Sequence, residues 1–295
     1  MSTANAVEPV DLSALQRPSG AFAMVAIDQR EALRNMFAEH TDAPVPDAAL
    51  TEFKLEAARA LSPYASAMLV DRQFAWEQVV AEQAVAPECG LIASADHFEA
   101  AYGEVVGRVT IDREVDPETV RAQGAAAMKL LVLYRPDGGG PERVSMVEEF
   151  VALCRSAGLI SIVEPVSRAP LGGGDWDWDA GVLAAAEELG SLGADLYKAE
   201  IPRHGEGPVE EVARRCEQIT ETVDSPWVVL SSGVREDVFP SAVETACRAG
   251  AAGFLAGRAV WASCIGTHDV TRELRTAAVD RLRRLGDLVD TVVGK

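Results

Sequence analysis

The chain has 295 residues, 48% of them hydrophobic, and a formal net charge of −19 at pH 7. A field of that sign repels polyanions, which argues against nonspecific binding to nucleic acid or to an anionic membrane surface. The five cysteines, at positions 89, 154, 216, 247 and 264, form no CxxC pair, which predicts free thiols in a reducing compartment instead of disulfides or a zinc site.

The N-terminus shows no targeting signal. The stretch MSTANAVEPVDLSALQ lacks the basic start and the apolar run of a signal peptide. No apolar stretch in the chain reaches the roughly 18 residues that a membrane-spanning helix needs. We therefore expect a cytoplasmic protein with neither a membrane nor a nucleic acid as partner.

Short apolar runs rich in β-branched residues recur along the chain and predict eight strands. They cover residues 22–28, 66–71, 90–94, 126–134, 159–165, 194–202, 227–233 and 253–261. Amphipathic segments between them predict helices over 47–61, 73–84, 142–157, 179–192, 208–223, 236–249 and 269–290. In DPETV, Asp116 as N-cap followed by Pro117 predicts one further helix start.

Strands that alternate with helices predict a parallel sheet covered on both faces. Eight such units in fewer than 300 residues match the (β/α)8 TIM barrel. The rival, a doubly wound open sheet, usually carries a glycine fingerprint after its first strand, but here that strand ends in AIDQRE. No linker or low-complexity tract interrupts the chain, so we expect a single barrel domain over residues 1–295, with 1–17 as an N-terminal extension.

Polar side chains stand near the carboxyl ends of most predicted strands, where the active-site residues of barrel enzymes lie. They are Asp28, Asp71, Lys129, Glu164, Lys198, Ser231 and Arg258. A structural role would explain any single one of them. Seven at equivalent strand positions predict a functional site on one face of the barrel.

Two of these residues are lysines within apolar runs, Lys129 and Lys198, in a chain that otherwise uses arginine for most of its 27 basic residues. A neighbouring cation and a dry pocket favour the neutral amine, which adds to carbonyls and forms Schiff bases. The structural alternative is two buried salt bridges, with Glu164 and Glu200, for which arginine would be better suited. Glu164 could shuttle protons and Asp28 could orient or deprotonate a substrate hydroxyl, or each could only brace a lysine.

Two glycine-containing turns predict an oxyanion site. SSGV (231–234) and LAGRAVW (255–261) follow the seventh and eighth predicted strands, where barrels commonly bind phosphate. Backbone amides near Gly233 and Gly257 could approach an oxyanion closely, a helix N-terminus would add positive charge, and Arg258 would add a bidentate donor. The glycine runs at 136–141 and 171–179 are predicted loops on the same rim, either gripping a ligand or only flexible.

The four histidines, at positions 40, 97, 204 and 268, show no spacing typical of metal ligands. GxSxG and Walker motifs are also missing from the sequence. We therefore expect neither a catalytic metal nor another cofactor. A metal-dependent aldol mechanism, in particular, would need histidines near strand ends.

Seven segments of the chain together carry a family signal. They are GAFAMVAIDQREALRNMF, SPYASAMLVDRQF, MKLLVLYR, LISIVEPV, GADLYKAEIP, PWVVLSSGV and AGFLAGRAVW. In combination they resemble the sulfofructosephosphate aldolases of sulfoglycolysis and, less closely, the class I tagatose-1,6-bisphosphate aldolases. The resemblance runs from about residue 18 to about residue 290 and leaves residues 1–17 and 168–179 unmatched.

The resemblance implies a (β/α)8 class I aldolase that cleaves 6-deoxy-6-sulfofructose 1-phosphate into dihydroxyacetone phosphate and 3-sulfolactaldehyde. It implies Lys198 as the Schiff-base lysine and Glu164 as the proton shuttle. Lys129 would polarise the site, and Asp28 would handle substrate hydroxyls. The family is typically oligomeric, so the resemblance also implies a homo-oligomer.

For substrate binding, the resemblance implies that four residues hold the phosphate that becomes dihydroxyacetone phosphate. These are Ser231, Gly233, Gly257 and Arg258. Gln29, Arg30 and Arg72 are candidates for the second anion, a sulfonate or a phosphate. Two alternatives stay open: a tagatose or fructose 1,6-bisphosphate aldolase, and a sugar-phosphate-binding regulator that keeps the fold without catalysis.

Overall fold

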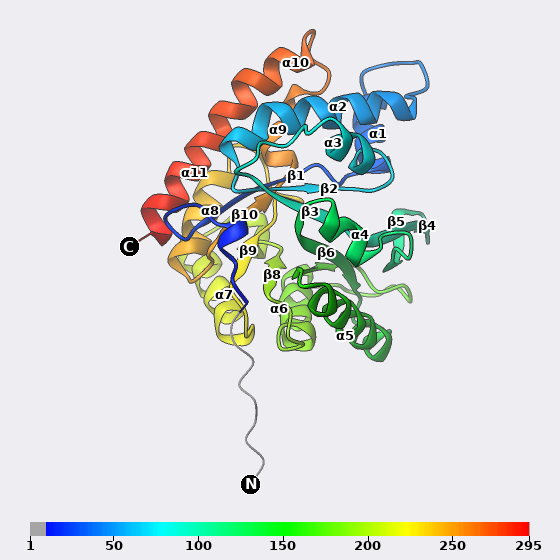
Figure 1. The fold of residues 1–295 in the computed structure, drawn as a ribbon. Coiled ribbons are helices and arrows are strands. Elements are labelled where there is room, and N and C mark those ends of the chain that lie inside the picture. Colours follow the sequence, from blue (N-terminus) through cyan, green and yellow to red (C-terminus); the bar gives the residue numbers. More distant parts are fainter. Residues whose placement is uncertain (1–9, 295) are drawn as a thin grey trace.

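Eight parallel strands form a closed barrel in the computed structural model, which describes residues 10–294 (Figure 1). Around the barrel the strands follow the order β1, β10, β9, β8, β7, β6, β3 and β2. Their bounds are β1 Phe22–Ala26, β2 Ala67–Val70, β3 Gly90–Ser94, β6 Ala125–Tyr134, β7 Ile160–Ser167, β8 Leu196–Ala199, β9 Trp227–Val229 and β10 Gly253–Ala256. The predicted (β/α)8 barrel is confirmed, and the open doubly wound sheet is excluded.

Helices cover the outside of this barrel, as Figure 1 shows. They are α1 Glu31–Ala38, α2 Asp47–Leu61, α3 Trp76–Ala81, α4 Pro117–Ala122, α5 Gly140–Ala157, α6 Trp178–Leu189, α7 Val209–Thr222, α8 Phe239–Arg248, α9 Arg258–Trp261, α10 Val270–Glu273 and α11 Val279–Val293. The predicted cap of α4 is confirmed, because the Asp116 carboxylate accepts a hydrogen bond from the Thr119 amide at 2.8 Å. Within residues 10–294 no helix combines the length and apolar character needed to cross a bilayer.

The structure differs from the predicted elements in three places. The strand predicted over 253–261 ends at Ala256, and the apolar residues after Gly257 form α9 instead. The helix α1 was not predicted. An antiparallel hairpin, β4 (Asp96–Ala101) and β5 (Glu104–Ile111), follows β3 and was also missed, because polar residues interrupt its strands, which lack the continuous apolar run used to predict strands.

Two separate apolar layers result from the alternation of side chains along each barrel strand. The inner layer fills the barrel and consists of Leu15, Phe22, Met24, Ala26, Ala67, Leu69, Ile92, Ala127, Ile160, Ile162, Leu196, Val228 and Leu255. The larger outer layer packs the strands against the helices. All five cysteines are free and buried, as the sequence predicted.

The described part of the predicted N-terminal extension closes the amino end of the barrel. Residues 1–9 lie outside the described residues, whereas Ser13–Leu15 form a short 3-10 helix. Leu15 is fully buried in the inner layer. A Cβ atom on Gly90 would lie 2.2 Å from the Ala14 carbonyl oxygen, so only glycine allows this close approach at the start of β3.

Candidate active site

A cavity of about 430 Å³ opens at the carboxyl ends of the barrel strands and contains most of the predicted site residues. Eight of the ten line it: Asp28, Gln29, Arg30, Glu164, Lys198, Ser231, Gly257 and Arg258. Lys129 lies directly behind the cavity wall, in contact with Asp28 and Glu164. Gly233 lies to one side and does not line the cavity.

The strand geometry explains why the four predicted catalytic residues converge. Side chains two positions apart on a strand point to the same face. Each of the four follows an inner-layer residue by two positions, the pairs being Ala26 and Asp28, Ala127 and Lys129, Ile162 and Glu164, and Leu196 and Lys198. The four polar residues therefore form the next layer of side chains inside the barrel, at the carboxyl end of the strands.

Lys198 and Glu164 form a close pair at the cavity surface. The lysine Nζ lies 2.8 Å from Glu164 Oε1, and Lys198 is only 3% exposed. The amine is thus sheltered from bulk water, yet it borders a space that can admit a substrate. One of the two salt bridges of the structural alternative is therefore present, but it has a cavity beside it, as a covalent role requires.

The second salt bridge considered from the sequence, between a lysine and Glu200, is not formed. Glu200 instead accepts a hydrogen bond from the Ser167 amide at 2.7 Å. Burial raises the pKa of Glu200 to about 8, more than that hydrogen bond and the nearby Arg168 and Arg258 lower it. At neutral pH this carboxyl is therefore mainly protonated and adds little negative charge to the site.

Lys129 sits at the centre of three carboxylates and is fully buried. Its Nζ lies 2.7 Å from Asp28, 2.6 Å from Asp96 and 3.1 Å from Glu164. Burial alone would lower the pKa of Lys129, but the three carboxylates together raise it. Lys129 is therefore a permanent cation. As a neighbouring cation it favours the neutral form of Lys198, and Lys129 itself stays charged.

Asp28 is the carboxylate that faces both the cavity and this cation. Burial alone would raise the pKa of Asp28, but Lys129 and Lys198 hold it well below its usual range. Asp28 therefore stays ionised across the physiological range. It can accept a hydrogen bond from a substrate hydroxyl while Lys129 fixes its orientation.

Asp96 completes the cluster, and the sequence analysis missed it. Its fully buried carboxylate accepts hydrogen bonds from Lys129 at 2.6 Å, Arg30 at 2.8 Å, Ser94 at 2.7 Å and the Leu131 amide at 3.1 Å. A signal was available, since Asp96 follows the inner-layer residue Ile92 by four positions, on the same strand face. The neighbouring His97 is half exposed on the hairpin.

Arg30 belongs to this cluster more than to the open cavity. Its Nη2 donates to Asp96 at 2.8 Å and to Ser94 at 3.2 Å, and its guanidinium lies 4.2 Å from the centre of the Phe98 ring. Gln29 is less committed, because its buried Oε1 has no hydrogen-bond partner among the described residues. This oxygen is an acceptor and cannot donate to an anion, whereas Arg30 has its Nη2 in use but keeps a buried Nε donor without a partner within residues 10–294.

Ser231, Gly257 and Arg258 lie together at another side of the cavity. The Gly257 amide donates to Ser231 Oγ at 3.3 Å, and Arg258 Nη2 donates to Ser232 Oγ at 2.6 Å. A Cβ atom on Gly257 would lie 2.7 Å from the Ala26 carbonyl oxygen and 2.9 Å from Gln29 Nε2, so a side chain does not fit there. This cluster of hydroxyl groups, amides and a guanidinium is suited to an oxyanion.

Gly233 stands behind this cluster, against the ring of His204. It has a φ of 75°, and a Cβ atom there would lie 2.6 Å from His204 Nδ1. The ring in turn stacks on Trp178, with the two ring centres 3.9 Å apart. Both the backbone conformation and the histidine therefore require glycine at this position, which differs from the predicted role in direct phosphate contact.

Two polar residues after β2 are turned away from the cavity. Asp71, one of the seven strand-end residues, pairs with the buried Lys54 of α2 and accepts a hydrogen bond from the Phe74 amide at 2.9 Å. Arg72, a candidate for the second anion, forms ion pairs with Asp112 at 3.0 Å and Glu114 at 2.7 Å. Both residues therefore have structural partners and do not line the cavity.

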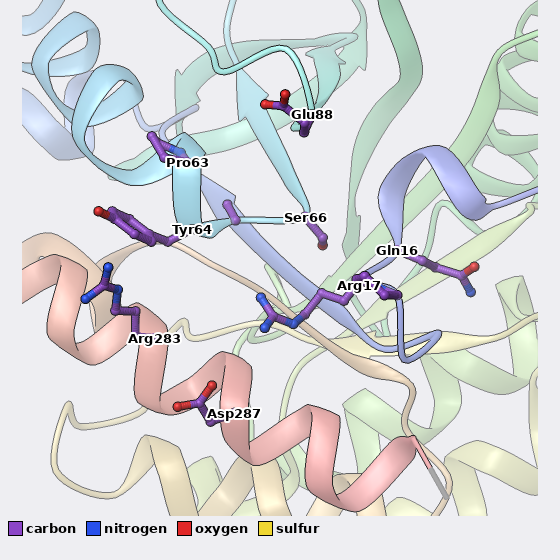
Figure 2. A pocket seen from close by; sticks show the side chains of 10 residues that line it. Gln16, Arg17, Pro63, Tyr64, Ser66, Glu88, Arg283 and Asp287 are labelled. Carbon is purple, nitrogen blue, oxygen red and sulfur yellow. The ribbon is translucent and has the colours of Figure 1, made fainter.

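A second hollow, of about 510 Å³, lies at the opposite, amino end of the barrel (Figure 2). Its arginines are engaged by the protein itself. Arg17 forms a bidentate contact with Asp290, and Arg283 lies 4.2 Å from the centre of the Tyr64 ring, as Figure 2 shows for the latter pair. The amino end of a barrel ordinarily serves stability, so the candidate site is the cavity around Lys198.

Within residues 10–294 no group of three or more histidine, cysteine, aspartate or glutamate side chains is arranged to hold a metal ion. The carboxylates of the cavity surround a lysine cation instead.

Comparisons with known proteins agree with this fold. The family model for DeoC/LacD family aldolases matches residues 22–263. The tagatose 1,6-diphosphate aldolase of Listeria monocytogenes is 27% identical, with 95% of this chain and 90% of the relative covered. Tagatose 1,6-diphosphate aldolase 2 of Streptococcus mutans is 24% identical over 95% of this chain and 93% of its own length.

Solved structures show the same architecture at low sequence identity. Fructose-bisphosphate aldolase from Plasmodium falciparum superposes with a TM-score of 0.71 at 12% identity, and 99% of each chain is covered. An archaeal fructose-1,6-bisphosphate aldolase, with its catalytic lysine bound to a carbinolamine intermediate, gives a TM-score of 0.61 at 16% identity, covering 94% of this chain and 96% of the other. These likenesses concern the fold.

Family, fold and site together define an aldolase, a carbon–carbon lyase built on a (β/α)8 barrel. The chain belongs to the DeoC/LacD family of aldolases, because the family model covers most of its length.

Proposed function

We propose that this aldolase is a class I enzyme in which Lys198 forms a Schiff base with the substrate. The observation that carries the proposal is the sheltered amine at the cavity surface, 2.8 Å from a carboxylate that can exchange protons with it. Lys129 and Asp28 fix the other side of that carboxylate and of the cavity. This is the arrangement of a nucleophile with an adjacent acid–base group.

Charge balance explains how the amine becomes a nucleophile. Three carboxylates face three cations in the cluster. The carboxylates belong to Asp28, Asp96 and Glu164, and the cations belong to Arg30, Lys129 and Lys198. Transfer of one proton from the Lys198 ammonium to Glu164 leaves a neutral amine and a neutral acid without changing the total charge. In a buried site, that transfer also removes two charges whose desolvation is costly.

The neutral amine then attacks the C2 ketone of the sugar phosphate and gives a carbinolamine, as the amine proton moves to the former carbonyl oxygen. Glu164 donates its proton to the carbinolamine hydroxyl, water leaves, and an iminium ion remains. A carboxylate, Asp28 or Glu164, takes the proton of the C4 hydroxyl. The C3–C4 bond breaks, its electron pair forms the enamine, and the aldehyde departs.

Protonation of the enamine at C3 and hydrolysis of the resulting iminium release dihydroxyacetone phosphate and restore Lys198. General acid–base help of this kind typically accelerates a reaction by about 100- to 10,000-fold. Ser231, Gly257 and Arg258 hold the phosphate of this product, with Gly233 allowing the turn to pack behind them. Binding energy at the phosphate positions C2 over the lysine.

The substrate we propose is 6-deoxy-6-sulfofructose 1-phosphate, cleaved to dihydroxyacetone phosphate and 3-sulfolactaldehyde. The seven segments that resemble sulfofructosephosphate aldolases support this choice. A second candidate is tagatose 1,6-bisphosphate, favoured by the printed activity of the bacterial relatives. A non-catalytic regulator is disfavoured, since such a protein has no need to keep both lysines and Glu164 in contact.

The test is borohydride reduction of the protein in the presence of dihydroxyacetone phosphate, followed by peptide mass spectrometry. We expect an adduct on the peptide that contains Lys198, and neither adduct nor cleavage with Lys198→Arg. Turnover that persists in this variant would refute the Schiff-base role. Comparing kcat/KM for the sulfonate substrate with those for tagatose and fructose 1,6-bisphosphate decides between the substrates, and a preference for a bisphosphate would overturn the sulfonate assignment.

A further inference from the structure

We propose that Arg168 binds the anionic group on the aldehyde half of the substrate, and that its surroundings select a group with a single negative charge. The inference rests on the proposed function and extends it to a residue that neither the sequence motifs nor the family match points out. Arg168 opens the segment 168–179, which the sequence resemblance left unmatched.

The first reason is that Arg168 is held less firmly by the protein than Arg30, another arginine that lines the cavity. Arg30 is held by Asp96, Ser94 and the ring of Phe98. The side chain of Arg168 donates only to the carbonyl of its neighbour Ser167 at 3.0 Å, and its Nε is 4.0 Å from Glu104. One third of the side chain is exposed.

The second reason is that the backbone of Arg168 is fixed by the sheet, whereas its guanidinium group is only loosely held. The Arg168 amide donates to the Tyr134 carbonyl at 2.9 Å and so continues the pairing of β6 with β7. By strand alternation, Glu164, Val166 and Arg168 share a face, and all three line the cavity. A rigidly rooted guanidinium with free donors is well suited to bind an oxyanion.

The third reason is its position relative to Arg258, the residue proposed to hold the phosphate. Arg168 follows β7 and Arg258 follows β10, and two strands, β8 and β9, separate these in the barrel. Arg168 also faces Glu104, on the hairpin beside β6. Both guanidinium groups line the same cavity. A substrate with an anion at each end can bridge them.

The charge near Arg168 explains the preference for one negative charge. Arg135 donates to Glu104 at 2.7 Å, so Arg135, Arg168 and Glu104 together carry a charge of +1. The catalytic cluster around Lys129 sums to zero when all its groups are charged. A sulfonate neutralises the +1 charge, whereas a phosphate monoester, with about −1.5 to −2 at pH 7, leaves negative charge uncompensated.

The experiment runs the aldol addition of dihydroxyacetone phosphate to three aldehydes: 3-sulfolactaldehyde, glyceraldehyde 3-phosphate and uncharged glyceraldehyde. With Arg168→Gln we expect KM for 3-sulfolactaldehyde to rise about 10- to 100-fold, the usual loss for a charge-assisted hydrogen bond. KM for uncharged glyceraldehyde should change little, and Arg168→Lys should restore part of the binding. Arg72→Gln is the matched control, since Arg72 pairs with Asp112 and Glu114 outside the cavity.

Trapping with dihydroxyacetone phosphate alone separates this inference from the proposed function. Absence of an adduct in the unmodified enzyme would refute the Schiff base, and that result concerns the proposed function and not the assignment of Arg168. If the unmodified enzyme forms the adduct, Arg168→Gln should form it at the same concentration of dihydroxyacetone phosphate. Arg258→Gln should need a higher concentration of dihydroxyacetone phosphate. Equal weakening in both variants would overturn the assignment of Arg168 to the aldehyde half.

The charge preference has its own variant, Glu104→Gln, which raises the local charge from +1 to +2. We expect the ratio of kcat/KM for glyceraldehyde 3-phosphate to that for 3-sulfolactaldehyde to increase about 10-fold or more. An unchanged ratio in a folded variant would overturn the claim that Glu104 sets the preferred charge.

Discussion

Replacement of Glu200 by glutamine should stabilise the enzyme, and by an amount that grows with pH. Glu200 is 3% exposed and lies two residues beyond Lys198, the proposed Schiff-base lysine, on the same segment. Burial raises the pKa of its carboxyl to about 8 from an ordinary value of 4.5. Glutamine has nearly the same shape and can still accept the hydrogen bond from the Ser167 amide, which is 2.7 Å long in the unmodified enzyme.

The size of the effect follows from proton linkage. Between pH 4.5 and pH 8 the unfolded chain releases the Glu200 proton and the folded protein keeps it, so this group destabilises the fold as pH rises through that window. Each pKa unit corresponds to about 1.4 kcal/mol, which gives a penalty on the order of 3 kcal/mol at pH 7 and about 5 kcal/mol above pH 8. Below pH 4.5 both states are protonated, and the penalty vanishes.

The assay is urea unfolding of the unmodified enzyme and Glu200→Gln at pH 5, 6, 7 and 8. The difference in unfolding free energy between the two proteins isolates this one group from all others that titrate. We expect the glutamine variant to gain stability relative to the unmodified enzyme at each step. A difference that stays flat with pH, or that favours glutamate at pH 8, would show that Glu200 is ionised in the folded state and would refute the reasoning.

Two further predictions concern buried pairs. Asp96→Asn should lower kcat far more than it raises KM and should shift the pH–rate profile, because Arg30 and Lys129 lose the carboxylate that orients both. Steady-state kinetics from pH 6 to 9 measure both effects, and an unchanged pH–rate profile would contradict the positioning role of Asp96. Lys54→Met should cost about 3 to 5 kcal/mol of stability, since it leaves Asp71 buried without its cation, and Lys54→Met with Asp71→Leu should recover part of that loss in urea unfolding.

The barrel and the core of the site could be predicted from sequence because both depend on simple periodicities. Alternation of apolar runs with amphipathic segments indicates the parallel barrel. The two-residue period within a strand then carries the catalytic groups, as for Lys198 after Leu196 and Lys129 after Ala127. Burial of an ammonium group is costly, which is why a lysine within an apolar run indicated chemistry.

Arg168 escaped prediction for a specific reason, although the same rule applied to it. The predicted strand stopped at residue 165, whereas β7 extends to Ser167, and this extension keeps Arg168 in phase with Glu164 on the cavity side. Pro165 lies within β7, and the strand continues through it. Arginine is also abundant in this chain, so composition gave no signal for any single one.

The hairpin and the environment of Gly233 depend on contacts between distant segments. Phe98 and Glu104 reach the cavity only because β4 and β5 pack against β6, and polar residues interrupt the apolar positions of both strands. Glycine at 233 reads as a ligand-binding turn, yet the structure gives it a neighbour, His204, from the segment after β8. Local sequence patterns contain no information about which side chain of a distant segment will pack against a given residue.

The charge distribution reconciles an anionic enzyme with the proposed substrate, which carries an anion at each end. The chain carries a formal charge of −19, which repels such a ligand at long range. At physiological ionic strength that field is screened beyond about 8 Å, and within the cavity the balance differs. The catalytic cluster is neutral, while Arg258 and the group around Arg168 each add positive charge at one end. Two separated cations beside a neutral amine are what a ketose with an anion at each end requires.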